Sequence, residues 1–298
     1  MGIVLFYYHI IIIGDYIMLK KISLCVFVIV LLILFSGKRN DFLPVFDEEK
    51  DTHLPVIMYH SVLSDKSRTG KYVITPQKFE EDLIYLKDMG YETISANQLI
   101  KYVYSDGELP ENPVLITFDD GMYNNYEYIL PILKKHNAFA IFSVVGSYTE
   151  EYTQSNIANT AYGYMRWCDI KELAASGYAE FGNHSYDFHS TSFGRYGTEK
   201  KKSESTLDYI NIFYQDTQKM QSEFFSNCGF RPVIYTYPFG SYSKESSRVL
   251  KKMGFLITLS CTEGINKIKK GEDCLYLLKR YNRDGRLTSK DFFSKLKL

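Results

Sequence analysis

Apolar and polar residues alternate in short blocks from about residue 54 to residue 281. Short apolar runs of this length predict buried β-strands, here at Val56–Tyr59, Glu92–Ser95, Val114–Phe118, Ala140–Val145, Ala179–Gly182, Val233–Tyr237, Leu256–Ser260 and Tyr276–Tyr281. Between them apolar residues recur at helical spacing, which predicts helices at Pro76–Met89, Asn97–Tyr104, Asn125–Lys135, Asp169–Ser176, Glu204–Phe225 and Lys244–Met253. Repeated strand–helix units of this kind indicate an α/β fold with a parallel sheet.

The number of units narrows the architecture further. About eight strands over roughly 240 residues fit a (β/α) barrel, in which catalytic groups gather at the C-terminal ends of the strands. In a closed barrel the last strand also lies beside the first. Residues near 281 are therefore expected to lie close to residues near 59.

A different pattern occupies the N-terminus. Lys20 and Lys21 precede an uncharged apolar run, Ile22–Phe35, a layout typical of a signal peptide or signal anchor. The run is slightly shorter than the roughly 17 to 25 residues of a spanning helix, and no small-x-small cleavage site follows it. We therefore favour an uncleaved signal-anchor or transmembrane segment over residues 1–37, rather than a peptide that is removed.

Two alternatives at this end remain open. Met18 directly precedes the basic pair and could be the true start, whereas the upstream apolar stretch Ile3–Ile13 could instead form a two-pass hairpin. A charged linker is expected over residues 38–53 and the catalytic domain over 54–298. We expect a single-pass protein of the cell membrane with this domain outside the cytoplasm, or a secreted protein if the signal is cleaved. Lys and Arg counts on the two sides are similar, so charge does not fix orientation.

Composition limits the class of partner. Lys plus Arg and Asp plus Glu both total 35 in the 298 residues, so the basic excess of a nucleic-acid-binding protein is absent. We expect no nucleic-acid partner, and a membrane contact only through the N-terminal segment. The five cysteines include no C-x-x-C pair, which argues against a thiolate zinc site. The four in the globular part are expected to be buried thiols.

Candidate chemistry begins with two adjacent carboxylates. Asp119 and Asp120 follow the apolar run Val114–Phe118 directly, and Gly121 allows the chain to turn after them. Burying two ionised carboxylates costs several kcal/mol unless a cation or a hydrogen-bond network compensates. The pair is best explained if one carboxylate binds a metal ion and the other is free to take a proton.

Histidines follow other strands of the predicted sheet. His184 and His189 come after Ala179–Gly182, and His60 comes directly after Val56–Tyr59. Parallel strands place all these positions, with Asp120, on one face. Two imidazoles and one carboxylate, with open positions for water and substrate, are a common arrangement at catalytic zinc sites.

Taken together, these motifs resemble the polysaccharide deacetylases of carbohydrate esterase family four. The resemblance spans roughly residues 54–282. It rests on Thr-Phe-Asp-Asp-Gly at 117–121, His-Ser with a second His at 184–189 and Tyr-Pro-Phe-Gly at 237–240, strengthened by Trp167 and by Met-Tyr-His ending at His60. The poly-N-acetylglucosamine and peptidoglycan deacetylase branch is the most similar. The resemblance implies a distorted (β/α)7–8 barrel, a divalent metal that is usually Zn²⁺, and removal of N-acetyl groups from N-acetylglucosamine of a cell-wall or extracellular polysaccharide.

The resemblance also implies residue roles. Asp120, His184 and His189 would bind the metal, Asp119 would be the general base, and the backbone N–H of Phe239 would stabilise the oxyanion. Aromatic side chains near the motifs are candidates to line the groove for the glycan: Trp167, Tyr186, Tyr237 and Phe239.

The chain departs from the family pattern at three places. The histidines are five residues apart, as in a longer-spaced subgroup. Where many members have an arginine that orients the catalytic aspartate, this chain has Thr236, and Arg166 and Arg231 are the substitutes considered. The last predicted strand lacks the histidine that often serves as the general acid. Because that strand should neighbour the first, we predict that His60 protonates the leaving amine; otherwise it is a structural histidine at a strand end.

Two other functions fit the same residues. An O-deacetylase acting on acetylated xylan or a similar sugar could use the same metal and aspartate. A catalytically silent glycan-binding protein of the same fold is the alternative outside enzymes.

Overall fold

The computed structural model describes residues 51–296. The predicted membrane segment at 1–37 and most of the predicted linker lie outside these residues. Strand β1 (Thr52–Leu54) begins within the last residues of that linker. Among the helices of residues 51–296, none is both long enough and apolar enough to cross a membrane.

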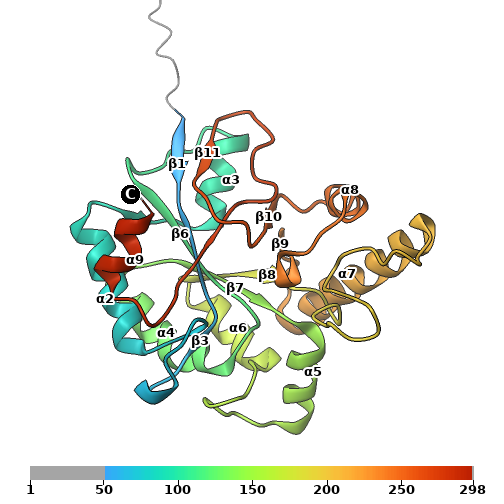
Figure 1. The fold of residues 1–298 in the computed structure, drawn as a ribbon, viewed down its shortest axis with the longest axis horizontal. Helices are drawn as coiled ribbons and strands as arrows, with labels where there is room; N and C mark the ends of the chain where they lie inside the picture. The colour runs from blue at the N-terminus through green and yellow to red at the C-terminus, as the bar shows by residue number, and fades with distance from the viewer. Residues whose placement is uncertain (1–50, 297–298) are drawn as a thin grey trace, which may run out of the picture. The chain divides into compact units, whose positions relative to one another are not determined.

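A curled parallel sheet forms the centre of the domain (Figure 1). Its strand order is β10–β9–β8–β7–β6–β2–β12, and β5 also pairs with β6. The strands are β2 (Val56–Tyr59), β5 (Glu92–Thr93), β6 (Pro113–Phe118), β7 (Ala140–Val144), β8 (Ala179–Asn183), β9 (Ile234–Thr236), β10 (Ile257–Leu259) and β12 (Tyr281–Asn282). Every pairing within it is parallel, which confirms the predicted α/β class.

The last strand lies beside the first, as expected. β12 pairs with β2, and a few residues earlier Leu278 forms a parallel bridge with Leu259 of β10. The predicted strand Tyr276–Tyr281 is nevertheless shorter and interrupted, because Leu277 has a φ of 58°, which a strand cannot accommodate. This terminal segment thus contacts both β10 and β2.

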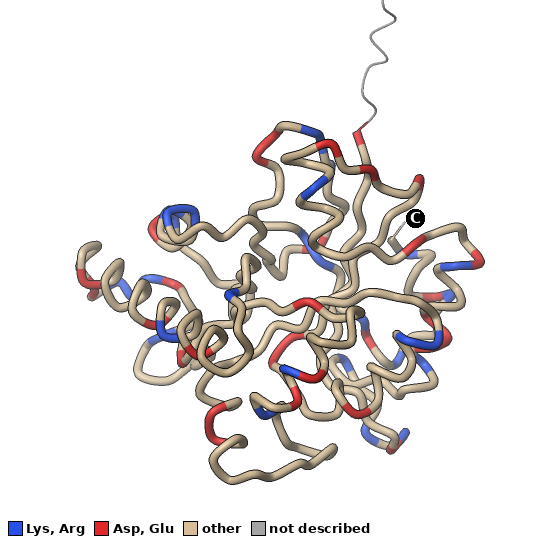
Figure 2. Tube along the Cα trace, turned by 180° about the vertical axis from the view of Figure 1, so that it is seen from behind, with Lys and Arg blue, Asp and Glu red and all other residues tan. Residues whose placement is uncertain are grey.

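Helices cover the outside of the sheet: α2 (Pro76–Asp88), α3 (Ala96–Tyr104), α4 (Tyr123–His136), α5 (Gly146–Ser155), α6 (Trp167–Ala175), α7 (Thr206–Cys228), α8 (Lys244–Lys252) and α9 (Ser289–Lys295). Six of them match predicted helices to within three residues at each end. The sequence pattern missed α5 and α9, and α5 buries only Gly146 and Thr149. Basic and acidic residues are interspersed along the outer helices and loops (Figure 2), in agreement with the balanced composition.

Short strands outside the central sheet complete the domain. β1 pairs antiparallel with β11 (Asn266–Ile268), and β3 (Ser61–Val62) pairs with β4 (Val73–Ile74). The four described cysteines are free thiols, but they are not buried as expected: Cys168 is exposed and the other three are partly buried.

A buried ion pair attaches the C-terminal segment to the rest of the domain. The Arg283 guanidinium donates to both oxygens of Asp82 on α2, at 2.8 and 2.9 Å, and the Tyr59 hydroxyl donates to the same carboxylate at 3.0 Å. Both charged side chains are fully buried. Removing one partner of such a pair typically costs about 3–5 kcal/mol, so this contact fixes the segment that follows β12.

Candidate functional site

One cavity of about 560 Å³ opens where the parallel strands end. Side chains at the ends of several strands and in the loops after them line it, including six of the predicted site residues: His60, Asp119, Asp120, His184, His189 and Phe239. The expectation that these positions converge is therefore confirmed by the structure.

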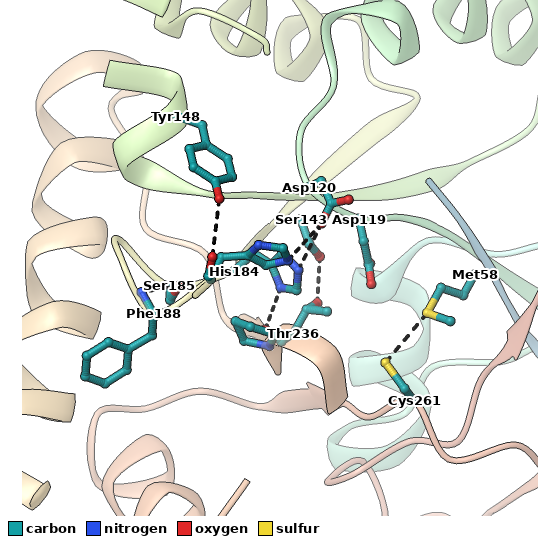
Figure 3. A network of polar contacts seen from close by, with 12 residues as sticks. Met58, Asp119, Asp120, Ser143, Tyr148, His184, Ser185, Phe188, Thr236 and Cys261 are labelled. Carbon is teal, nitrogen blue, oxygen red and sulfur yellow. Dashed lines mark hydrogen bonds and ion pairs between the residues drawn. The ribbon is translucent and has the colours of Figure 1, made fainter. Parts of the chain in front are cut away.

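The two adjacent aspartates point in different directions because the backbone turns between them. Asp120 has a φ of 70° and Gly121 a φ of 74°, so the chain leaves β6 in the left-handed region that favours glycine. A Cβ at Gly121 would lie 2.8 Å from a methyl carbon of Val144, which excludes larger residues there. In Figure 3, Asp120 points toward His184 and Asp119 lies apart from it.

Asp120 and the two histidines form a compact set of donor atoms. The Nε2 atoms of His184 and His189 lie 3.5 and 3.2 Å from Oδ1 of Asp120, and all three donor atoms lie within 4.8 Å of one another. Ligands about 2.1 Å from a tetrahedral Zn²⁺ are roughly 3.4 Å apart. The donor set therefore fits a divalent metal ion.

Neighbouring groups prepare His184 for this role. Its Nδ1–H donates to the backbone oxygen of Thr236 at 2.8 Å (Figure 3), which orients the ring so that Nε2 faces Asp120. Burial alone would raise the pKa of Asp120, but hydrogen bonds from His184 and His189 outweigh it and hold that pKa well below its usual range. Asp120 is thus anionic, as a metal ligand must be.

A buried arginine holds the second aspartate. The Arg280 guanidinium donates to both oxygens of Asp119, at 2.7 and 2.8 Å, and its Nε–H donates to the backbone oxygen of Ser260 at 2.7 Å. Both charged side chains are almost completely buried. Burial acts to raise the pKa of Asp119, but the charge and hydrogen bonds of Arg280 outweigh it and keep that pKa below its usual range.

This arginine corrects the sequence interpretation. Neither substitute considered reaches Asp119, since Arg166 pairs with Asp169 at 2.8 Å and Arg231 lies over the ring of Phe225. Arg280 lies in the segment between Leu278 and β12, which contacts both β10 and β2. Its contact with Asp119 therefore joins residues that are 161 positions apart in the sequence. The signal that could have found it was the expected adjacency of the last and first strands.

His60 stands at the end of β2 on the same cavity. Its ring contacts the edge of Tyr72, with centroids 4.9 Å apart, and its buried Nδ1 has no hydrogen-bond partner among the described residues. Burial lowers the pKa of His60, and the charges of Asp119 and Asp120 oppose this shift only in part. A lowered pKa makes the protonated imidazole a stronger acid, although it reduces the fraction that is protonated.

Phe239 lines the cavity beside His189, one of the candidate metal ligands. It has a φ of 57° within the 3₁₀ turn Pro238–Gly240, and its ring lies 4.5 Å from that of His189. A Cβ at Gly240 would lie 2.6 to 2.8 Å from Cys261. This close approach explains why glycine follows the phenylalanine.

The other predicted groove residues do not line the cavity. Trp167 is 4% exposed and packs against Phe224, and Tyr237 is fully buried. Tyr186 is partly buried, with the Lys219 ammonium 3.6 Å from its ring centroid. These side chains face the core because neighbouring positions of a strand or helix point to different sides. Instead, Tyr72 and Tyr196 line the cavity and are 47% and 52% exposed.

Comparison with known proteins identifies similar chains. A family model described as polysaccharide deacetylase matches residues 106–257, about half of this chain. The poly-beta-1,6-N-acetyl-D-glucosamine N-deacetylase of Escherichia coli K12 is 22% identical over 83% of this chain, and the protein of that name from Staphylococcus aureus MSSA476 is 24% identical over 67%. This chain spans 40% and 65% of the lengths of those relatives. A solved de-N-acetylase from Aggregatibacter actinomycetemcomitans superposes with a TM-score of 0.67 at 25% identity, over 80% of this chain and 99% of that one.

Proposed function

Because this chain belongs to the polysaccharide deacetylase family, we propose that it hydrolyses N-acetyl groups of N-acetylglucosamine residues in a cell-wall or extracellular polysaccharide. The observation that carries the proposal is the arrangement of two aspartates in one cavity. Asp120 converges with two imidazoles while Asp119 is held separately by a buried arginine. Relatives named as N-deacetylases of poly-N-acetylglucosamine support the substrate class.

Asp120, His184 and His189 would hold a divalent ion, and two imidazoles with one carboxylate favour Zn²⁺. When bound, such an ion polarises the acetyl carbonyl and lowers the pKa of a water molecule. The protein supplies the remaining steps through groups already positioned around the cavity.

Asp119 is placed to take the proton of the attacking water. The two hydrogen bonds from Arg280 fix the carboxylate plane and keep it ionised, so the base is oriented before substrate arrives. Orientation of this kind lowers the barrier because a near-attack geometry need not be found at each turnover. The same hydrogen bonds reduce the basicity of Asp119, which limits its driving force as a base.

His60 and Phe239 would complete the reaction. The carbonyl oxygen gains negative charge as water adds, and a backbone N–H aimed at that position would stabilise it. Phe239 lines the cavity, and its backbone N–H is the group assigned this role. His60, on the same cavity, donates a proton to the departing amine. The products are acetate and a free amine on the glycan.

Acetate release tests this function. We expect the purified protein to release acetate from N-acetylglucosamine oligomers, to lose this activity with a chelator and to regain it with Zn²⁺. Asp119→Asn should abolish release while retaining metal. Release from acetylated xylan alone would identify an O-deacetylase, and glycan binding without release after Zn²⁺ addition would identify a silent binding protein.

We also propose that the N-terminal segment anchors the protein in the cell membrane with the catalytic domain outside the cytoplasm. The basic flank and apolar run at Lys20–Phe35 support this. Protease added to intact cells should degrade the domain, whereas protection of the domain until lysis would contradict this orientation.

A further inference from the structure

The turn between the two histidines decides where the second imidazole lies. His184 follows β8 directly, and its N–H bonds to the backbone oxygen of Val144 on β7. His189 lies five residues later and must return to within 3.2 Å of Asp120. The turn begins with Ser185 at a φ of 70°, a conformation that non-glycine residues rarely adopt. Other contacts must therefore hold it.

Asp216 of α7 holds the middle of this turn. Its Oδ1 accepts the backbone N–H of Tyr186 at 2.9 Å, and its Oδ2 accepts that of Asp187 at 2.7 Å. Within the described residues, these are the hydrogen bonds that the carboxylate makes. Each oxygen thus accepts the N–H of one of two consecutive peptide groups, whereas an amide in this place would turn its NH2 group toward one of the two N–H donors.

Helix α5 holds the same turn from the opposite side of the peptide groups. The N–H groups of Gly146 and Ser147 donate to the backbone oxygens of Ser185 and Tyr186, at 3.0 and 2.8 Å. The hydroxyl of the next residue, Tyr148, donates to the backbone oxygen of His189 at 3.2 Å. The turn therefore lies between a carboxylate of α7 and the first turn of α5.

A partly buried carboxylate is an unfavourable choice for fixing an ordinary loop. The pKa of Asp216 is raised to about 6, mainly by burial and in part by the charge of Asp187, against the lowering effect of the two N–H donors and of Lys219. Residues retained against such a cost are often found at functional sites. Among the described residues, the hydrogen bonds of this carboxylate go to the turn between the two candidate histidine ligands.

We propose that Asp216 is a positioning residue of the metal centre, which fixes His189 for coordination by holding the peptide groups of Tyr186 and Asp187. The proposal rests on the metal site of the proposed function and adds to it a residue from α7 that contacts neither metal nor substrate. Partners behind the ligands of metal sites commonly change metal affinity by about 10- to 100-fold when mutated.

Zn²⁺ affinity tests the proposal without any substrate. The purified wild-type protein and Asp216→Asn are titrated with Zn²⁺ in competition with a chromophoric chelator. We expect the dissociation constant to rise by about 10- to 100-fold in Asp216→Asn. Glu223→Gln, on the same helix with the same loss of one charge, should bind Zn²⁺ like the wild type. At saturating Zn²⁺, acetate release by Asp216→Asn should recover, because the base and the acid are untouched.

The Zn²⁺ titrations distinguish failure of the positioning role from failure of the metal centre. Equal Zn²⁺ affinity in wild type and Asp216→Asn overturns the positioning role and leaves the proposed function standing. Absence of Zn²⁺ binding in the wild type overturns the metal centre itself. If Asp216→Asn does not fold, Tyr148→Phe decides, because it removes only the hydroxyl bond to His189. A several-fold weaker affinity then supports a turn held for coordination, and unchanged affinity refutes it.

Discussion

Replacing Arg280 by methionine should separate the chemistry of the site from the stability of the fold. Methionine retains much of the side-chain length but removes both hydrogen bonds to Asp119 and the only cation that contacts it in the described structure. Burial then acts on Asp119 without the charge of Arg280, so the pKa of Asp119 should rise and a larger fraction of the carboxylate should hold a proton. A protonated aspartate cannot accept another from water.

The expected size follows from the contacts. Leaving one member of a fully buried pair unpaired costs about 3–5 kcal/mol of stability, and loss of general-base catalysis costs about 10²- to 10⁴-fold in turnover. Arg280→Lys should recover little activity, because an ammonium cannot reproduce the two parallel hydrogen bonds of the guanidinium.

Arg283→Met is the matched control. Arg283 is equally buried and also pairs with an aspartate through two hydrogen bonds, but that aspartate is Asp82 on α2. Both variants should unfold at lower denaturant concentration, and both should retain Zn²⁺. The turnover number per folded, metal-loaded molecule should fall strongly only in Arg280→Met. Equal turnover losses in the two variants would show that Arg280 acts through stability alone and would refute the orienting role.

Three further predictions follow from the structure. His60→Ala should reduce turnover by about 10²- to 10⁴-fold with metal content unchanged, and unchanged turnover would reject it as the general acid. Between about pH 4 and pH 6 the folded protein holds a proton on Asp216 that the unfolded chain, with a pKa near 3.9, releases; this group's contribution to stability should therefore decrease as pH rises through that window. Urea midpoints measured across the window should lose that component in Asp216→Asn, and an identical pH profile in the variant would contradict the shift. Trp167→Ala should lower stability by about 3–5 kcal/mol without changing KM, because the side chain is buried, whereas Tyr196→Ala should raise KM with stability preserved; the reverse pattern in denaturation and kinetics would show that the groove is misplaced.

The sequence by itself determined the strands of the central sheet, apart from the interruption in the last one, six of the helices and most of the groups that line the candidate cavity. Strand runs were identifiable because parallel strands buried on both faces are continuously apolar, and the chemistry was identifiable because polar residues stand where such runs end. Asp119 and Asp120 are adjacent, and His184 follows its strand directly. Parallel topology alone brings such positions to one face, so no long-range contact had to be known.

Only the tertiary structure decided which residues support that chemistry. Arg280 reaches Asp119 because the segment before β12 lies between β10 and β2. Asp216 reaches the turn between His184 and His189 because α7 packs against that turn. Trp167 and Tyr237 stand next to the motifs in sequence yet face the core, since the direction of a side chain depends on the rotation of its backbone. Local residue patterns specify where a strand ends. The packing of the whole chain decides which distant groups meet and whether an aromatic ring faces the core or the solvent.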